Sequence, residues 1–231
     1  MNGLDFLVNV AAEADDDISA AFRDGHYPAQ ALVRLMLSLL QAGDKVLDLG
    51  AHIGSFSLAA AAAGCDVLAV EASPRNAELL KMSAALNGFD RLRVLQAVVS
   101  DKSGHIDFSP LGPFGHVRAP IDTQWIKIAA ISGDELIANT GWDRVKFVKI
   151  DIEGSEVAAA RGLTGLLSRG DAAPIVLYES NGHALSWYGH TPKELKSEFE
   201  RFGYQNYLVE NDRLTLVQVD DLQPETVADY L

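Results

Sequence analysis

The sequence VLDLGAHIG (residues 46–54) is the stretch that decides the fold. The apolar residues Val46, Leu47 and Leu49 surround Asp48, and Gly50 and Gly54 follow four positions apart. Glycine adopts a positive φ without steric penalty, so a strand that ends in glycines leads into a loop whose backbone a ligand can approach. The stretch therefore predicts a buried strand followed by a ligand-binding loop.

Strands and helices alternate outward from this loop. Buried strands are expected at 45–51, 66–73, 92–100, 145–154 and 174–180, and helices at 17–24, 29–44, 55–64, 73–88, 155–170 and 191–203. Ser73 as N-cap, Pro74 at the first helical position and Gly88 past the end mark one helix clearly, and Gly43 is expected to stop another. Alternation of this kind is typical of an α/β protein with a doubly wound, mostly parallel sheet.

Two segments depart from the alternation. HIDFSP (105–110) and QWIKIAAI (124–131) read as short antiparallel strands, which predicts a small β insertion after the third strand. YQNYLVE (204–210) and RLTLVQV (213–219) predict a terminal antiparallel hairpin around residues 211–213. We expect one domain overall, with a helical segment over residues 1–44 packed on a core domain over residues 45–231.

Composition narrows the function. The 231 residues carry 32 acidic and 19 basic side chains, for a formal net charge of -13, which disfavours nucleic acid as a partner. The one cysteine, Cys65, excludes an internal disulfide framework. Without a secretory pattern at the N-terminus or an apolar run long enough to span a bilayer, the sequence predicts a cytoplasmic protein that does not bind membranes. It leaves the oligomeric state open, with a homodimer as one option.

The spacing of the glycines discriminates between two candidate cofactors, a nicotinamide dinucleotide and S-adenosylmethionine. A dinucleotide loop has the pattern Gly-x-Gly-x-x-Gly, whereas Gly50 and Gly54 enclose Ala51, His52 and Ile53. Either cofactor would present a ribose to Glu71, at the end of the second strand. Asp48 places a carboxylate under the loop, within reach of an amino group. The spacing therefore favours S-adenosylmethionine over a nicotinamide cofactor.

The chain resembles the FkbM-type S-adenosylmethionine-dependent methyltransferases. The blocks VLDLGAHIGSFSLAAA, VLAVEASPRNAELLKMSAALNG, AVVSDKSGHIDF and VKFVKIDIEGSEVAAARG follow the order of that family between Lys45 and Gly162. The resemblance implies a class I methyltransferase fold, with Asp48, Gly50 and Gly54 on the methionyl side of the cofactor, Glu71 on the ribose and the backbone near Val98 by the adenine. The cofactor-binding set expected in full is Asp48, Gly50, Ala51, His52, Gly54, Glu71, Ala72, Val98 and Asp151.

Two positions depart from the family pattern. His52 stands where the family commonly has asparagine, and both residues enter left-handed conformations more readily than most. His52 is therefore expected to serve the backbone of the loop, with a catalytic role as the alternative. After the fifth strand, Glu179 keeps the acid of the family but His183 is displaced.

Candidates for catalysis follow the fourth and fifth strands. If the acceptor is a hydroxyl, a histidine or carboxylate within hydrogen-bonding distance can take its proton. The catalytic set expected is Asp151, Glu153, Glu179 and His183. On a strand these two side chains would lie on the face of the sheet and not at its carboxyl end, so Asp151 and Glu153 are expected to share a pocket there only if the strand has already ended. For Glu153 a helix N-terminal role is equally open, and Glu156 is expected to decorate the first turn of that helix.

The sequence also bears on metal binding, on the acceptor site and on the reaction. These carboxylates could hold Mg²⁺, but no Cys or His ligand spacing is present, so no metal is expected. Aromatic and histidine side chains could line the acceptor site: Phe114, His116, Trp187, Tyr188 and His190. The function expected is methyl transfer to a hydroxyl of a small-molecule metabolite such as a sugar or polyketide, with methylation at nitrogen left open. The alternatives are a cofactor-binding protein without transferase activity and a nicotinamide-dependent oxidoreductase.

Overall fold

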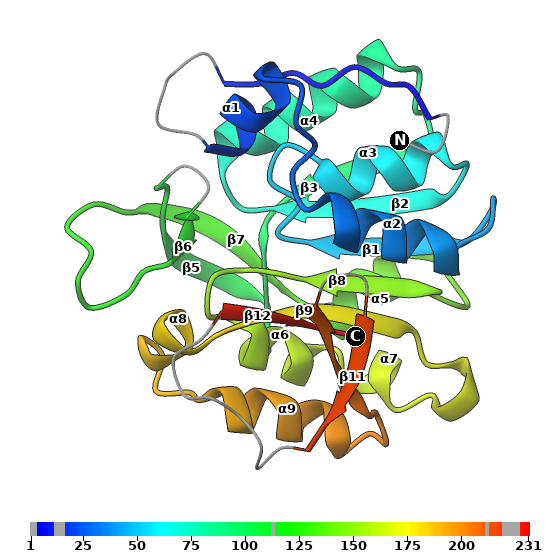
Figure 1. Ribbon diagram of the computed structural model, residues 1–231. Coiled ribbons are helices and arrows are strands. Elements are labelled where there is room, and N and C mark those ends of the chain that lie inside the picture. The colour runs from blue at the N-terminus through cyan, green and yellow to red at the C-terminus, as the bar shows by residue number, and fades with distance from the viewer. Residues whose placement is uncertain (1–3, 12–16, 112–113, 211–212, 219–226) are drawn as a thin grey trace.

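An eight-stranded sheet forms the centre of the protein in the computed structural model, which describes residues 4–11, 17–111, 114–210, 213–218 and 227–231 (Figure 1). Its strand order is β11-β10-β12-β9-β8-β1-β2-β3. The strands are β1 (Lys45–Leu49), β2 (Asp66–Glu71), β3 (Leu92–Gln96), β8 (Phe147–Ile150), β9 (Ile175–Asn181), β10 (Asn206–Glu210), β11 (Arg213–Val217) and β12 (Val227–Tyr230). β1 pairs in parallel with both β2 and β8, so the chain reverses its direction of winding at the carboxyl end of β1. The doubly wound fold expected from the sequence is confirmed.

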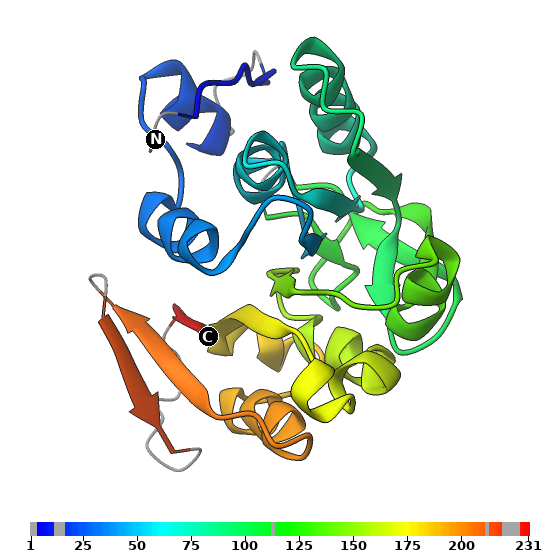
Figure 2. The ribbon, with the colours of Figure 1, turned by 90° about the vertical axis from the view of Figure 1, so that its right-hand side faces the viewer.

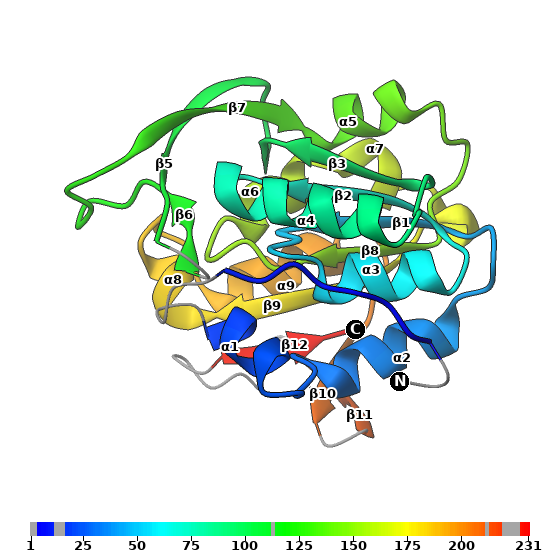
Figure 3. The same ribbon diagram turned by 90° about the horizontal axis from the view of Figure 1, so that it is seen from above.

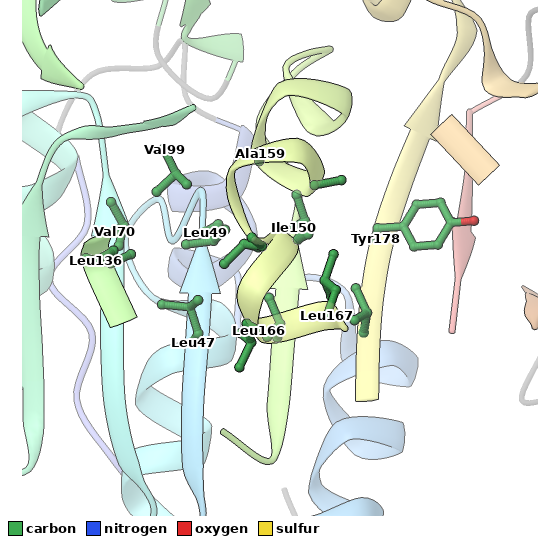
Figure 4. Packing of buried hydrophobic residues seen from close by; sticks show 14 of the residues in the cluster. Leu47, Leu49, Val70, Val99, Leu136, Ile150, Ala159, Leu166, Leu167 and Tyr178 are labelled. Carbon is green, nitrogen blue, oxygen red and sulfur yellow. The ribbon is translucent and has the colours of Figure 1, made fainter. Parts of the chain in front are cut away.

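Helices cover both faces of this sheet (Figure 2). On one face lie α2 (Gln30–Leu39), α3 (Ser55–Ala62) and α4 (Pro74–Leu86); on the other lie α5 (Gly133–Thr140), α6 (Glu156–Gly162), α7 (Thr164–Leu167) and α9 (Pro192–Glu200). Alternate residues of the strands supply the two cores, because side chains along a strand alternate between faces. Leu47 and Leu49 face α6 and α7 (Figure 4), whereas Val46 packs with α2 and α3.

Local signals place the helix ends. The Ser73 side chain accepts a hydrogen bond from Asn76 N, and Pro74 opens α4 as expected. Thr191 caps α9 in the same way by accepting from Glu194 N. The expectation for α2 was wrong at its end: the helix stops at Leu39, and Leu40 adopts an extended conformation before Gly43 is reached. Gly43 has a φ of 90° and turns the chain into β1 instead.

The third predicted strand is two strands. β3 ends at Gln96, and β4 (Val98–Ser100) leaves the main sheet to pair in parallel with β7 (Ile126–Ser132). β5 (Gly104–Ser109) and β6 (His116–Val117) complete a four-stranded second sheet in the order β4-β7-β5-β6. The predicted β insertion is thus confirmed but larger than expected, and its β5, β6 and β7 project from one side of the molecule (Figure 3).

Four other elements differ from expectation. α5 was not predicted, and the single helix expected over residues 155–170 is broken at Leu163 into α6 and α7. The loop expected over residues 181–190 contains α8 (Gly182–Ser186). The hairpin of β10 and β11 is confirmed, although residues 211–212 at its turn lie outside the described residues. β12 was not predicted: it inserts antiparallel between β9 and β10, so the hairpin forms the edge of the sheet.

The N-terminal segment packs against the face that carries α3 and α4. It contains α1 (Asp17–Arg23) and α2, and the buried Val33 and Met36 of α2 join the core beside Val46. Tyr27 donates a hydrogen bond from its hydroxyl to Ser55 O, at the start of α3. Within the described ranges, no helix combines the length and apolar character that crossing a bilayer requires.

Candidate active site

A pocket opens at the carboxyl ends of β1, β2, β8 and β9, where the winding reverses. Its walls come mainly from six places: the loop after β1, the end of β2, β4 with the second sheet, the loop after β8, Glu179 of β9, and the N-terminal segment. Most of the expected cofactor residues line it, namely Gly50, Ala51, His52, Glu71, Ala72, Val98 and Asp151. Asp48 and Gly54 do not reach the pocket and support the loop from behind.

The glycines of the loop are fixed by close packing. A Cβ atom on Gly50 would lie 1.8 Å from Asp151 O, so the loop after β1 touches the loop after β8. Gly54 has a φ of 103°, and a Cβ there would lie 2.4 Å from Leu80 Cδ1 of α4. His52 takes a left-handed φ of 50°, as its side-chain type permits. The loop is therefore a preformed backbone turn over the N-terminus of α3.

Glu71 ties the first two βα loops together. Its Oε2 accepts from His52 N and its Oε1 from Ser73 N, both at 2.8 Å. Burial raises the pKa of the Glu71 carboxyl, and these two backbone N–H groups oppose the rise. Each carboxylate oxygen has a second acceptor position, so the side chain can still receive hydroxyl groups from a ribose in the pocket.

Lys149 is a site residue that the sequence analysis missed. It lies directly opposite Asp48 in the β1–β8 pair and is almost fully buried. Its Nζ donates to Gly50 O at 2.8 Å and lies 3.2 Å from Asp151 Oδ2 and 3.7 Å from Asp48 Oδ1. Burial disfavours the ammonium, but Asp151 and Asp48 outweigh that effect and raise the pKa of Lys149 above its usual value. A lysine inside the strand VKFVKI was the available signal, because a buried lysine needs partners.

Asp48 lies beneath the loop, fully buried. Its Oδ2 accepts from Ser57 Oγ at 2.5 Å, and its Oδ1 faces Lys149. Burial raises the pKa of the Asp48 carboxyl, while Lys149 and Ser57 oppose the rise. Asp48 thus anchors Lys149 and α3, and Lys149 in turn holds the carbonyl of Gly50.

Three of the four predicted catalytic side chains come together in the pocket. β8 ends at Ile150, so Asp151 and Glu153 are free to face one cavity, and one carboxylate oxygen each of Asp151, Glu153 and Glu179 lies within 4.8 Å of the others. Glu153 has a left-handed φ of 53°, a strained conformation that is uncommon outside functional sites. Burial first and the charge of Asp151 second raise the pKa of Glu153 to about 7 and that of Glu179 to about 9.

Glu156 is not the exposed first-turn residue that the sequence suggested. It is fully buried, and its Oε1 accepts from Ile152 N and Gly154 N at 3.0 and 3.1 Å. Burial raises its pKa to about 7, against the effect of these N–H groups. Glu156 therefore shapes the loop that presents Asp151 and Glu153.

His183 is not brought to the carboxylates. It is exposed on α8, with its ring against Trp187 at 5.3 Å between centroids, and it does not line the pocket. Of the aromatic and histidine residues considered for the acceptor site, Phe114 and His116 line the pocket. Trp187 packs on His116 at 4.7 Å, whereas His190 pairs with Glu194 at 3.0 Å.

The residues of the pocket fit S-adenosylmethionine. Gly50 leaves no room for a side chain, as a close backbone approach requires, and Glu71 stands at the end of β2. Val98 and Val99 offer an apolar wall for a purine. Five carboxylates line the pocket, from Asp17, Glu71, Asp151, Glu153 and Glu179, and among its described residues Lys149 is the only lysine or arginine. An excess of carboxyl groups over basic side chains suits a cofactor with a sulfonium and an ammonium group.

Comparison with known proteins agrees with this fit. A hexuronic acid methyltransferase, AglP of Haloferax volcanii, is 28% identical over 143 residues, which are 60% of this chain and 57% of that protein. The 23S rRNA (uracil(1939)-C(5))-methyltransferase RlmD of Shewanella amazonensis is 35% identical over 94 residues, which are 37% of this chain and 21% of that protein. The matched region is thus about half of the first relative and a fifth of the second.

A solved structure shares the fold. The precorrin-6y C5,15-methyltransferase of Geobacter metallireducens GS-15 superposes with a TM-score of 0.51 at 11% identity, over 87% of this chain and 86% of that one. The family described as the methyltransferase FkbM domain matches residues 48–205, which include the glycine loop, Glu71 and the carboxylates after β8 and β9. The chain therefore belongs to the FkbM family of S-adenosylmethionine-dependent methyltransferases.

Proposed function

We propose that this protein transfers the methyl group of S-adenosylmethionine to a hydroxyl group of a small molecule. The observation that carries the proposal is the carboxylate cluster of Asp151, Glu153 and Glu179, in the same pocket as the glycine loop. Methyl transfer needs alignment of the acceptor, exclusion of water and a base for the hydroxyl proton. The cofactor, when bound, supplies an electrophilic methyl group.

In this proposal Glu153 is the base. A carboxyl with a pKa of about 7 is partly ionised at neutral pH and can accept a proton, close to the optimum for general-base catalysis. Glu179, with a pKa of about 9, keeps its proton and can donate a hydrogen bond to the acceptor. Asp151, held by Lys149 at 3.2 Å, stays on the cofactor side of the pocket. His183 lies outside this group and has no assigned step.

Three alternatives have less support. A binding protein without transferase activity would not require the strained backbone of Glu153 or the raised pKa of Glu179. A nicotinamide-dependent oxidoreductase would require the third glycine that the loop lacks. An RNA acceptor has the RlmD match in its favour, but the net charge of -13 and the acidic pocket would repel a phosphate backbone.

Cofactor titration tests the proposal. We expect S-adenosylmethionine and S-adenosylhomocysteine to bind in calorimetry, while NAD and NADP do not. Glu71→Ala should weaken S-adenosylhomocysteine by about 1 to 3 kcal/mol, the range for lost hydrogen bonds to a charged group. Labelled methyl transfer to a panel of hydroxylated metabolites then identifies the acceptor. Tighter binding of NAD than of both adenosyl compounds would contradict the proposal.

Turnover is expected to survive excess EDTA. The three carboxyl groups lie close enough to hold a divalent cation, but the proton on Glu179 and the ammonium of Lys149 already relieve their repulsion. The rate is measured before and after chelation and dialysis. A loss of activity that Mg²⁺ or Mn²⁺ restores would instead make Asp151, Glu153 and Glu179 metal ligands.

A further inference from the structure

An apolar surface leads out of the pocket along the second sheet. Phe108 of β5 pairs directly with Val117 of β6 on one side and with Ile126 of β7 on the other. Directly paired residues of antiparallel strands point to the same face, so these three side chains form one row. Phe108, nearly fully buried, and Val117, half-buried, line the pocket, while Ile126 is 37% exposed at the other end of the row.

Phe114 extends the same surface at the mouth of the pocket. It contributes to the pocket lining and is nevertheless 58% exposed. We call Phe108, Phe114, Val117 and Ile126 the apolar ledge. An exposed apolar surface continuous with a binding pocket is typical of a ligand site.

Buried polar contacts hold the ledge in place. His116, between Phe114 and Val117, is nearly fully buried; its Nδ1 lies 2.7 Å from Phe114 O and its Nε2 lies 3.1 Å from Asp122 Oδ2. Asp122 also accepts from Ala119 N at 2.7 Å. Both ring nitrogens of His116 face acceptors, so this histidine braces the ledge and has no position left for a substrate proton.

Tyr188 connects the ledge to the catalytic loop. Its hydroxyl donates to Val117 O, and a Cβ on Gly154 would lie 2.9 Å from its ring. Tyr188 therefore lies between the ledge and the loop that carries Asp151 and Glu153. One acceptor molecule can touch both. The pocket is acidic where Asp151, Glu153 and Glu179 meet, whereas the side chains of the ledge carry no charge.

We propose that the acceptor is an amphiphile: a neutral or cationic hydroxylated group, turned toward Glu153 and Glu179, joined to an apolar body that lies on the ledge. This inference rests on the proposed function and narrows its substrate class. Apolar contact with the ledge supplies binding energy remote from the reacting hydroxyl, which orients that hydroxyl. An anionic head group would lie beside Asp151 and Glu153 in a pocket whose described residues include a single lysine and no arginine, so it is disfavoured.

Three sugar probes test the inference on the full chain saturated with S-adenosylhomocysteine. In calorimetry below its micelle-forming concentration, n-octyl β-D-glucoside should bind about tenfold or more tightly than methyl β-D-glucoside. It should also bind more tightly than n-octyl β-D-glucuronide, which carries a negative charge. Equal binding of the two glucosides, including no binding of either, would overturn the inference.

Ledge variants locate the effect. Phe114→Ser and Ile126→Ser should each weaken n-octyl β-D-glucoside by about fivefold and leave S-adenosylhomocysteine affinity unchanged. Met82→Ser and Leu86→Ser, at exposed positions of α4, are matched controls that should change neither. Octyl binding that the ledge variants do not weaken, or a dimer that Phe114→Ser splits into monomers, would overturn the inference.

The failure of this inference differs from failure of the proposed function. A wild-type protein that does not bind S-adenosylhomocysteine contradicts the proposed function itself. A protein that binds S-adenosylhomocysteine but does not prefer n-octyl β-D-glucoside over methyl β-D-glucoside contradicts only the amphiphilic acceptor and leaves the proposed function intact.

Discussion

Replacing Lys149 with methionine is expected to destabilise the protein by about 3 to 5 kcal/mol, the range for breaking a buried ion pair by removing one partner. Methionine keeps an apolar stem of similar length but removes the ammonium. Asp48, fully buried, would then face no cation, and Gly50 O would lose its 2.8 Å donor. Gly50 belongs to the turn proposed to bind the cofactor, so affinity for S-adenosylhomocysteine should fall by tenfold or more, that is by about 1.4 kcal/mol or more.

Two further variants distinguish the effect of an unpaired buried charge from the effect of losing any lysine near β8. Asp48→Asn combined with Lys149→Met removes both members of the pair and should recover about 1 to 3 kcal/mol, because no uncompensated buried charge remains beside the loop. Its cofactor affinity should stay low, since Gly50 O still lacks its donor. Lys146→Met, beyond the other end of β8, should stay within about 0.5 kcal/mol of wild type. Urea unfolding and calorimetry provide both measurements; a Lys149→Met protein as stable as wild type would contradict the role given to this lysine.

The main sheet and most helices were predictable because their signals are local. Apolar runs bounded by glycine gave β1, β2 and β8, and the cap at Ser73 with Pro74 gave α4. These signals concern neighbouring residues, so they do not depend on what the rest of the chain does. The glycine spacing at Gly50 and Gly54 likewise identified the cofactor class, because close backbone approach restricts residue type locally.

The elements that were missed depend on distant partners. Nothing in LRVLQAVVS marks the point where the chain changes sheets between Gln96 and Val98, since both halves have the apolar pattern of a strand. β12 exists because it completes pairing between β9 and β10, which its four residues alone cannot indicate. α5 is different: Ser132 as N-cap, acidic residues in its first turn and Gly141 at its end were readable signals.

Which residues line the candidate site was predictable in part, and how they are arranged was less so. Asp151, Glu153 and Glu179 were identified from the ends of two strands, yet their meeting depended on β8 ending at Ile150. His183 stood in a segment interpreted as a polar loop, and α8 turns it to solvent. The contribution of Asp17, Ile18, Pro28 and Ala29 to the pocket arises from the path of the N-terminal segment, which no local pattern reports.

Glu153→Gln is expected to slow methyl transfer by about 10²- to 10⁴-fold, the usual contribution of a general base. Glutamine has the shape of a protonated glutamate but cannot accept the proton of the acceptor hydroxyl. The wild-type kcat/KM should rise with pH through an apparent pKa near 7 as Glu153 loses its proton, and this limb should disappear in the variant. Affinity for S-adenosylhomocysteine should change little, because the side chain keeps its volume at the same position.

Glu179→Gln supplies the matched comparison, since it removes an equivalent carboxylate from the same cluster. With a pKa of about 9, Glu179 is already protonated at pH 7, and glutamine can replace its hydrogen bond to the acceptor. The rate at pH 7 should therefore fall by less than about tenfold. Glu78→Gln, at an exposed position of α4, controls for loss of negative charge alone. If Glu179→Gln removed the pH limb and Glu153→Gln retained it, Glu179 would be the base, and the strained backbone at Glu153 would serve only to shape the loop.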